Sequence, residues 1–384
     1  MAPTRSFNRA SWNEENLMAD KIRVGIVGAT VTTGGSGWGA NAHVPALASL
    51  PDYELVAVCT SREETAKASA EKFGARLAFH DIKDMVAHPD VDLVAVSVRV
   101  PWHYDLVMAG LRANKPVFCE WPLGANLKEA QEMNDLAQER KLATMVGLQA
   151  RSDPTLQYAK ELVEQGYIGE VLAANLSVMT GAQIVRGPGR IWQGERKNGA
   201  NTMTIAGGHP LDALCFILGE FAEVTGRVST RIKNWKHEDT GADFPVDSPD
   251  VVSIAGVLES GAEVSYQVAS VPSSPSGTRY EIYGRDGTLV ISGGGSANIG
   301  PNILYGAKGK DPLAEMPAPD KFKLVPEGTP AGPPRNVAQA YARAADAMQA
   351  GKMPDPDFAV AVTRHRLIDA IERSSETGRS IALQ

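Results

Sequence analysis

Short apolar runs alternate with amphipathic segments along the first part of the chain. Runs rich in Val, Ile and Ala are typical of buried parallel strands, and they occupy residues 22–28, 54–59, 92–98, 116–119 and 143–147. Helical periodicity fills the intervals, over residues 42–49, 63–73, 103–113 and 127–141. Strands that alternate with helices in this way build right-handed βαβ units and a parallel sheet. We therefore expect residues 21–147 to form a doubly wound α/β domain.

The pattern changes after residue 147. A helix is predicted over residues 155–165, and the strands that follow have few helices between them. These strands are predicted at residues 171–179, 223–232, 251–258, 262–269, 279–283 and 288–291. Turn signals such as residues 259–261 and 284–287 join successive strands, which favours antiparallel pairing. Residues 148–384 are therefore expected to form an α+β domain on a largely antiparallel open sheet, which would bind substrate and support oligomerisation.

The two ends of the chain differ in character. Residues 1–20 are polar and lack the apolar segment of a secretory signal, so we expect a poorly ordered arm. Residues 309–335 are rich in Pro and Gly and are expected to run over the surface. Helices are predicted again over residues 336–349 and 357–377.

The composition narrows the classes of function. The formal net charge is −7, which argues against a nucleic-acid partner because such proteins are usually basic. No apolar run reaches the roughly 18 residues that a membrane span needs. Cys59, Cys119 and Cys215 are widely spaced, and two of them fall in apolar runs. We expect free buried thiols in a cytoplasmic protein, with neither a disulfide frame nor a metal site.

A glycine-rich stretch follows the first predicted strand. Gly28 ends that strand, and after an intervening segment residues 35–40 and 37–42 both fit Gly-x-Gly-x-x-Ala, so the register of the loop stays open. Glycines here let backbone N–H groups approach a pyrophosphate at a helix N-terminus. The strand before and the helix after favour a dinucleotide site over a flexible surface loop. The candidate dinucleotide contacts in this stretch are Gly28, Ala29, Gly37, Trp38 and Gly39.

The second predicted strand is followed by Ser61 and Arg62. An NAD site usually places Asp or Glu here for the ribose 2′-hydroxyl, whereas a hydroxyl and a guanidinium suit the 2′-phosphate of NADP. The alternative is that Ser61 caps the next helix, because Glu63 and Glu64 follow at capping distance. Both roles are compatible at one helix end. We predict NADP in preference to NAD.

With these features in hand, the chain resembles the Gfo/Idh/MocA (glucose–fructose oxidoreductase / inositol dehydrogenase) family. The resemblance extends over residues 21–384 and depends on the order and spacing of short motifs. These are the first strand with its glycine loop, His43 with Pro45-Ala46-Leu47, Pro101 with His103, Glu120-x-Pro122-Leu123, residues 147–151 and 166–170, Gly208-His209 with Asp212, and the stretch from Asp357 to Arg379. The resemblance implies a Rossmann domain, a second domain with an open sheet, and a homo-dimer or homo-tetramer that acts on sugars, polyols or related alcohols.

Within the family, the chain is most similar to the branch that contains the fungal galactose-regulon repressor and its bacterial relatives. It shares Gly37-Trp38, Glu120-Trp121 and the stretch from Gln149-x-Arg151 through residues 167–169 with that branch. The resemblance implies a second class of function, a regulator that binds a dinucleotide without turnover and recognises a partner protein.

Trp121 stands where the family carries a lysine that serves hydride chemistry. An indole cannot exchange a proton, and Ile205 stands at the position of the family's aspartate, four residues before His209. His209 remains as the acid–base candidate, because imidazole titrates near neutrality; the alternative is a helix-start histidine satisfied by backbone. Asp212 is predicted to orient that imidazole, or else to suit the dipole of a first helical turn. Lys197 is a candidate replacement for the lost lysine, or part of a solvated charge cluster.

Further candidates lie beside these positions. Val98, Arg99, His103, Glu120 and Trp121 follow or end two predicted strands and are assigned to the dinucleotide. Substrate contacts are assigned to Trp121, Arg151, Trp192 and His209, because aromatic faces stack on sugar rings and a guanidinium anchors polar groups. Core packing and ion pairing are the alternatives.

The sequence therefore favours an NAD(P)-dependent oxidoreductase of a carbohydrate-like alcohol or ketone, with an atypical site that lacks the usual lysine. Two alternatives stay open: a non-catalytic dinucleotide-binding regulator, and a redox-neutral enzyme with a tightly held cofactor.

Overall fold

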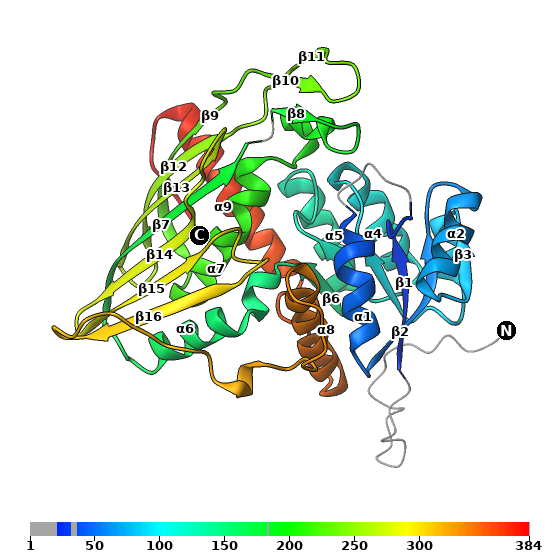
Figure 1. Cartoon of the computed structure of the whole chain (residues 1–384), viewed down its shortest axis with the longest axis horizontal. Coiled ribbons are helices and arrows are strands. Elements are labelled where there is room, and N and C mark those ends of the chain that lie inside the picture. The colour runs from blue at the N-terminus through cyan, green and yellow to red at the C-terminus, as the bar shows by residue number, and fades with distance from the viewer. Residues whose placement is uncertain (1–20, 32–36, 183, 384) are drawn as a thin grey trace. The chain divides into compact units, whose positions relative to one another are not determined.

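The computed structural model describes residues 21–31, 37–182 and 184–383. The chain divides into two compact units (Figure 1): Met1–Gly147 with Leu324–Val362, and Leu148–Lys323 with Thr363–Gln384. The sequence assigns everything after residue 147 to the second domain, whereas residues 324–362 rejoin the first unit. The expected N-terminal arm, and residues 32–36 of the glycine-rich stretch, lie outside the described residues.

The first unit contains a parallel sheet with strand order β3-β2-β1-β4-β5-β6. Strands β4, β5 and β6 are buried at every position, so both faces of the sheet are covered. The order reverses between β1 and β4, and this is the switch point where open α/β sheets bind ligands at the carboxyl ends of their strands. The strands are β1 Ile22–Val27, β2 Tyr53–Cys59, β3 Leu77–Phe79, β4 Leu93–Val96, β5 Val117–Glu120 and β6 Thr144–Gly147.

Local sequence sets the ends of the helices between these strands. The Asn126 side chain accepts the N–H of Glu129 at the start of one helix, and Gly74, with a φ of 72°, ends another. The sequence analysis missed β3 and α3, because elements this short show no clear period. The helices are η2 Gly39–His43 (a π-helix), α1 Val44–Ser49, α2 Glu63–Phe73, α3 Ile82–Ala87, η3 Val100–Trp102, α4 His103–Arg112 and α5 Leu127–Glu139.

Helix α8 (Pro333–Gln349) explains why a late segment belongs to the first unit. It packs against η2 and α1, and its buried face enters the apolar core of the parallel sheet. Val337 and Tyr341 are fully buried there with Ile26 and Phe118. Each large apolar side chain buried in this way contributes about 1.5–3 kcal/mol. The amphipathic pattern predicts this helix, but it does not indicate which sheet the helix covers.

The second unit contains a large sheet with strand order β17-β16-β15-β14-β7-β13-β12-β9-β18. Its pairs are antiparallel except for β7 with β13. This confirms the predicted, mostly antiparallel sheet. The strands are β7 Val171–Gly181, β9 Phe221–Ser229, β12 Val251–Leu258, β13 Glu263–Val271, β14 Gly277–Gly284, β15 Gly287–Gly293, β16 Asn302–Lys308, β17 Ala314–Glu315 and β18 Ile381–Ala382.

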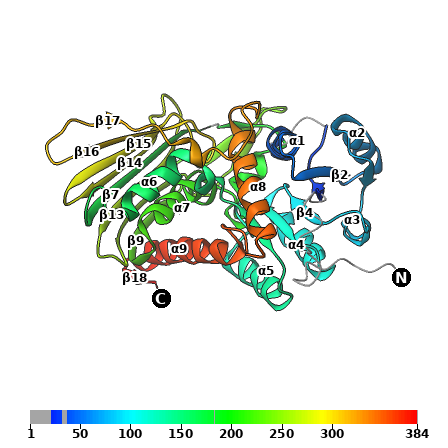
Figure 2. The same cartoon turned by 90° about the horizontal axis from the view of Figure 1, so that it is seen from below.

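Helices lie on one face of this sheet. Figures 1 and 2 show α6 (Pro154–Glu164), α7 (Gly208–Leu218) and α9 (Phe358–Thr377) on that face, and among the described residues no helix covers the other face. Helix α7 is apolar on nearly all sides and is buried from Gly208 to Ile217, as a helix inside a core must be. The sequence analysis placed only a helical start here.

A smaller sheet, with order β11-β10-β8, also belongs to the second unit. Its strands are too short to show a period, and the sequence analysis missed them. They are β8 Val185–Arg186, β10 Asn234–His237 and β11 Asp243–Pro245. The remaining short helices of the unit are η4 Gln149–Ser152, η5 Ile191–Gly194, η6 Arg196–Asn198, η7 Thr202–Ala206 (a π-helix) and η8 Asp320–Phe322.

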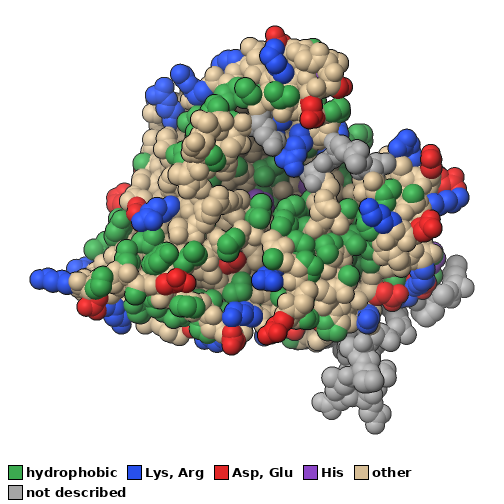
Figure 3. Space-filling view, in the orientation of Figure 1, with side chains coloured by type: hydrophobic (Ala, Val, Ile, Leu, Met, Phe, Trp, Pro, Cys, Tyr) green, Lys and Arg blue, Asp and Glu red, His purple; other side chains and the backbone are tan. Residues whose placement is uncertain are grey.

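Three further features of the described residues concern the helices, the cysteines and the surface charge. Its helices fall short of the length and apolar character that crossing a bilayer requires. Cys59, Cys119 and Cys215 are free and buried, as predicted. On the face shown in Figure 3, Lys and Arg side chains are interspersed with Asp and Glu side chains.

Candidate functional site

Two glycines bring backbone segments close together at the switch point of the first unit. Gly28 follows β1 with a φ of 99°, and a Cβ there would lie 2.1 Å from the carbonyl oxygen of Ser97, just after β4. Gly39 begins η2, and a Cβ there would lie 3.0 Å from the backbone nitrogen of Ala29. Side chains are therefore excluded where the strand meets the helix. This leaves bare backbone of the kind that cradles a pyrophosphate.

Gly37 and Trp38 form the entry to η2. Gly37 has a φ of 64°, and its carbonyl oxygen accepts the backbone N–H of Asn41 at 2.7 Å. The Trp38 side chain is half-buried and packs against the core of the first unit. Trp38 therefore contributes to packing in the first unit.

Ser61 and Arg62 are exposed at the end of β2. The N-cap residue of α2 is Arg62, and no side chain caps that helix, so the alternative that Ser61 is the cap is wrong. The hydroxyls of Thr60 and Thr65 instead donate to the carbonyl oxygen of Arg62, at 3.0 Å and 2.9 Å. These bonds fix the turn that presents Ser61 and Arg62 to solvent.

His103 ties together the two loops that follow β4 and β5. Its Nδ1 lies 2.8 Å from the carbonyl oxygen of Pro122, and its Nε2 lies 3.2 Å from that of Val98. Burial lowers the pKa of His103 and outweighs the two carbonyl groups, which raise it. Because both ring nitrogens face backbone, the structure gives His103 a supporting role in place of the predicted direct contact. Arg99 and Trp102 are exposed on the same loop.

Glu120 and Trp121 lie at the carboxyl end of β5. Only 8% of Glu120 and 4% of Trp121 is exposed. The Oε1 atom of Glu120 lies 2.8 Å from Nε2 of His43, which is fully buried on η2. The Oε2 atom lies over Gly147, where a Cβ would approach it to 2.5 Å. Glu120 is therefore a buried carboxylate held by an imidazole beside the carboxyl edge of the sheet.

In the second unit, His209 lies in the first turn of α7 and is 5% exposed. Two tyrosines of the large sheet hold this turn. The hydroxyl of Tyr266 on β13 donates to the carbonyl oxygen of Gly207 at 3.0 Å, and that of Tyr280 on β14 donates to the carbonyl oxygen of Pro210 at 3.1 Å. The backbone on either side of His209 is thereby fixed.

Asp212 and Arg151 form a buried ion pair within the second unit. Both Asp212 oxygens accept from Arg151, at 2.8 Å each, and Oδ1 also accepts from Nε of Arg364 at 3.1 Å. Burial alone would raise the pKa of Asp212, but the two guanidinium groups outweigh it and hold this pKa below its usual range. Both oxygens are occupied by arginines, so the structure does not support Asp212 as the group that orients His209. Arg151 is likewise engaged internally, which differs from the predicted substrate anchor.

Lys197 and Trp192 lie on short helices of the second unit. The Lys197 side chain is 75% exposed, and its Nζ pairs with Glu195 at 3.3 Å. This matches the solvated charge cluster and not the replacement lysine. The indole nitrogen of Trp192 donates to the carbonyl oxygen of Gly189 at 2.8 Å, which fixes its own loop.

Sequence reasoning missed several residues that shape these two regions. Tyr341 of α8 contacts His43, with its hydroxyl 2.9 Å from Nδ1. Arg364 of α9 is fully buried, and it also contacts Cys215 and Glu220. Its helical spacing from Ala361, Ile368 and Ile371 places this arginine on the buried face of α9, which was a usable signal because a buried charge needs a partner. Nothing in the local sequence around Tyr341 indicated its partner.

The first unit alone fits a dinucleotide on structural grounds. The strand order is that of dinucleotide-binding sheets, and the switch point coincides with a glycine whose place no side chain can fill. The exposed hydroxyl and guanidinium at the end of β2 supply polar groups where the adenosine ribose of such ligands lies. Among the described residues, no group of three or more His, Cys, Asp or Glu could hold a metal ion.

Comparisons with known proteins agree with this geometry. Residues 22–148 match the family model described as an oxidoreductase family with an NAD-binding Rossmann fold, and residues 154–293 match the Gal80p C-terminal domain. Dehydrogenase aclE of Aspergillus oryzae is 32% identical over 379 residues, which cover 94% of this chain and 98% of that protein. The galactose/lactose metabolism regulatory protein GAL80 of Saccharomyces cerevisiae is 28% identical over 335 residues, which cover 80% of this chain and 76% of that protein.

A solved structure shows the same fold. The complex of levoglucosan dehydrogenase with NADH and levoglucosan superposes with a TM-score of 0.82 at 21% identity, covering 94% of this chain and 99% of that one. The relative at 32% identity spans nearly the whole of both chains, and the family model covers the parallel sheet. The chain therefore belongs to the Gfo/Idh/MocA family of NAD-binding Rossmann-fold oxidoreductases.

Proposed function

We propose that this protein is an NAD(P)-dependent oxidoreductase that acts on a sugar, a polyol or a related alcohol or ketone. One observation carries the proposal: the backbone approach at Gly28, at the switch point of a sheet ordered as in dinucleotide-binding proteins. The relatives support the substrate class, since one of them is a levoglucosan dehydrogenase and another is a dehydrogenase over nearly the full length.

Different groups of the protein would bind the dinucleotide and exchange the substrate proton. Backbone N–H groups of Ala29 and of Gly37, Trp38 and Gly39 at the start of η2 would bind the pyrophosphate, because the positive end of a helix and bare N–H groups both favour an anion. The chemistry that a bound NAD(P) would supply is acceptance of a hydride from the carbinol carbon. His209 would exchange the hydroxyl proton, since the usual lysine is replaced by Trp121, which has no exchangeable proton of suitable pKa. Loss of a positioned acid–base group costs about 10²–10⁴-fold in rate, so we expect slow turnover.

We propose NADP as the preferred cofactor. Arg62 and Ser61 are exposed at the end of β2, where a 2′-phosphate would lie. A guanidinium binds phosphate through two parallel hydrogen bonds, which an Asp or Glu at this position could not do.

A second candidate function is a dinucleotide-binding regulator without turnover that recognises a partner protein. Two observations favour it: Trp121 stands at the lysine position, and residues 154–293 match the C-terminal domain named for Gal80p. The third candidate function is a redox-neutral enzyme with a tightly held cofactor. Such an enzyme should retain its dinucleotide through purification.

One series of measurements separates these readings. The purified full-length protein is denatured, and the released nucleotides are identified by mass spectrometry. It is then titrated with NADPH and NADH by fluorescence and assayed with NADP⁺ and NAD⁺ against a panel of sugars and polyols that includes levoglucosan and inositols. If the protein is an oxidoreductase, we expect reduced nicotinamide to form with at least one alcohol of the panel, and we expect His209→Ala to abolish its formation. Tight binding with no turnover across the panel favours the regulator, and no binding of either dinucleotide refutes all three.

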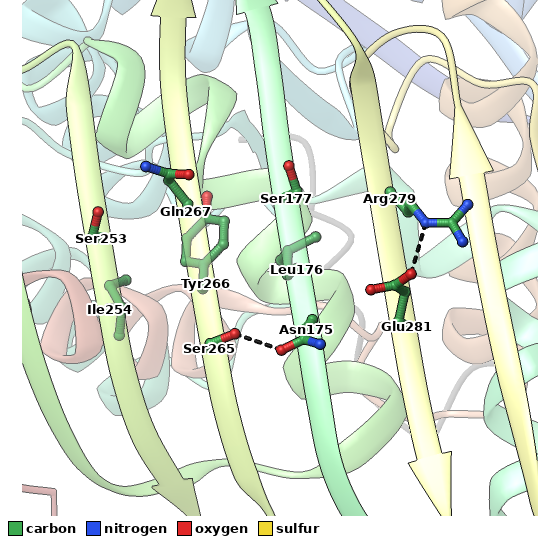
Figure 4. Close-up of a pocket in the computed structure, with 10 residues that line it drawn as sticks. All are labelled: Asn175, Leu176, Ser177, Ser253, Ile254, Ser265, Tyr266, Gln267, Arg279 and Glu281. Carbon is green, nitrogen blue, oxygen red and sulfur yellow. Dashed lines mark hydrogen bonds and ion pairs between the residues drawn. The ribbon is translucent and has the colours of Figure 1, made fainter.

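We also propose that the chain forms a homo-oligomer through the uncovered face of the large sheet. This face holds a shallow depression of about 400 Å³, lined mostly by polar residues, among them Arg279 and Glu281, which pair at 2.9 Å (Figure 4). A second copy related by a two-fold axis would meet the same opposite charges, which suits self-association. Light scattering of the wild type and of Glu281→Arg tests this, since the like charges of the variant should favour the monomer.

A further inference from the structure

A buried chain of hydrogen bonds in the first unit connects three distant parts of the sequence. Nε2 of His43 lies 2.8 Å from Oε1 of Glu120, and Nδ1 of His43 lies 2.9 Å from the hydroxyl of Tyr341. The imidazole and the phenol are fully buried, and Glu120 is 8% exposed. The chain thus joins the π-helix after the glycine loop, the end of β5 and helix α8.

The carboxylate sets the direction of the bond between His43 and Glu120. An ionised carboxylate only accepts, so Nε2 of His43 donates to Glu120. Burial raises the pKa of Tyr341 well above its usual value, with smaller contributions from Tyr53 and Glu120, so the phenol keeps its proton. The Tyr341 hydroxyl and Nδ1 of His43 form the second bond of the chain, and the two bonds together fix the orientation of the imidazole toward Glu120.

The surroundings leave the imidazole little freedom. The ring of His43 packs edge-on against Phe118, with centroids 5.1 Å apart, and against Tyr341, with centroids 5.7 Å apart. On the other side of the carboxylate, Oε2 of Glu120 rests over the backbone of Gly147. A satisfied buried network of this kind fixes one geometry, because every alternative leaves a polar group unpaired in the core.

We propose that His43 and Tyr341 are positioning residues, which hold the Glu120 carboxylate at the carboxyl edge of β5 to accept hydrogen bonds from the nicotinamide half of the dinucleotide. The adenosine half of such a ligand lies at β2, so the other half extends over β4 and β5. The donors that this half offers to a carboxylate are its ribose hydroxyls and its carboxamide NH₂. The proposal rests on the dinucleotide binding proposed above. It makes dinucleotide affinity depend on α8, a helix that follows the last parallel strand by nearly two hundred residues.

A matched pair of phenols tests the proposal. Tyr341→Phe removes the hydroxyl that orients His43, whereas Tyr53→Phe removes a buried hydroxyl that donates to the backbone oxygen of Tyr341 at 2.9 Å, outside the chain to Glu120. Each variant loses one hydrogen bond in the same core, so the urea concentration at the midpoint of unfolding should fall by a similar amount in both. The full-length protein and the two variants are titrated with NADPH and NADH by fluorescence, and KM for the dinucleotide and for the alcohol are compared where turnover is seen.

We expect Tyr341→Phe to raise the Kd of the dinucleotide about five-fold and to leave KM for the alcohol unchanged, and Tyr53→Phe to keep Kd within about two-fold of wild type. His43→Gln, which keeps an amide donor for Glu120, should bind more tightly than His43→Leu. Equal Kd values for the two tyrosine variants would overturn the positioning role and leave the proposed function standing. A wild type that binds neither dinucleotide would overturn both.

Discussion

Replacing Gly28 by alanine tests whether the backbone approach at the switch point builds the dinucleotide site. Two separate costs are expected. With a φ of 99°, alanine would occupy a conformation that L-residues avoid, at about 1–2 kcal/mol. Its Cβ would also lie 2.1 Å from the carbonyl oxygen of Ser97 and 2.7 Å from a methyl group of Val98, so the ends of β1 and β4 must move apart. Together we expect a loss of about 3–5 kcal/mol in the free energy of unfolding.

Gly74 provides the matched control for this change. It ends α2 with a φ of 72°, and a Cβ there would meet no atom within 4 Å. Gly74→Ala therefore carries the conformational cost of about 1–2 kcal/mol without the collision. The difference between the two variants isolates the close approach of the strands.

The assay combines stability with binding. Urea unfolding gives the free energy of unfolding of each variant, and fluorescence titration of the folded protein gives the Kd for NADPH and NADH. Gly28→Ala should weaken dinucleotide binding by more than about ten-fold, and Gly74→Ala should leave it unchanged, because its position is distant from the switch point in the strand order. The reasoning is refuted if the two variants show the same stability and the same Kd.

Three further predictions concern charge. Arg62→Ala should weaken NADPH binding by about ten-fold or more while NADH binding stays constant, which parallel titrations would measure; an equal loss for both would contradict a 2′-phosphate contact. Asp212→Asn should cost about 3–5 kcal/mol in urea unfolding, because it removes the carboxylate that pairs with Arg151 and one of the two carboxylates that pair with Arg364. The lowered pKa of Asp212 means that its stabilisation is present above about pH 4 and is lost as pH falls further. Burial lowers the pKa of His365 from 6.5 to about 3. The free energy of unfolding should therefore fall as pH drops from about 6.5 towards 3, by up to about 1.4 kcal/mol per pH unit. His365→Gln should remove this contribution to the pH dependence measured by urea unfolding, and an unchanged pH dependence in the variant would contradict the prediction.

Much of the fold could be predicted from the sequence because its signals are local. Apolar runs and helical periodicity located β1, β2 and α2 within one or two residues, since each element is long enough to show its period. The change of pattern after residue 147 indicated the switch from a parallel to a mostly antiparallel sheet. Strands of two or three residues, such as β8 and β17, were missed because they are too short to show a period.

In the candidate site, too, the features with local sequence signals were predicted and those that depend on distant residues were not. The glycine at residue 28 and the exposed pair Ser61 and Arg62 were identified because a strand end, a turn and a helix start leave a recognisable order of residues. The predicted roles of Asp212 and Arg151 did not anticipate their mutual ion pair, since the partners are 61 residues apart and the pairing is decided by burial in one core. A buried charge takes whichever opposite charge the fold brings to it.

The sequence by itself determined the dinucleotide-type sheet and the replacement of the family's lysine by Trp121, because both can be recognised from residues that are close together in the chain. Only the tertiary structure decided that α8 returns to the first unit and that Tyr341 bonds to His43 across 298 positions of the chain. The sequence of an amphipathic helix shows which face must be buried, but it does not show which surface of the protein covers that face. Hydrogen bonds between residues so far apart exist only once that surface has been chosen by packing.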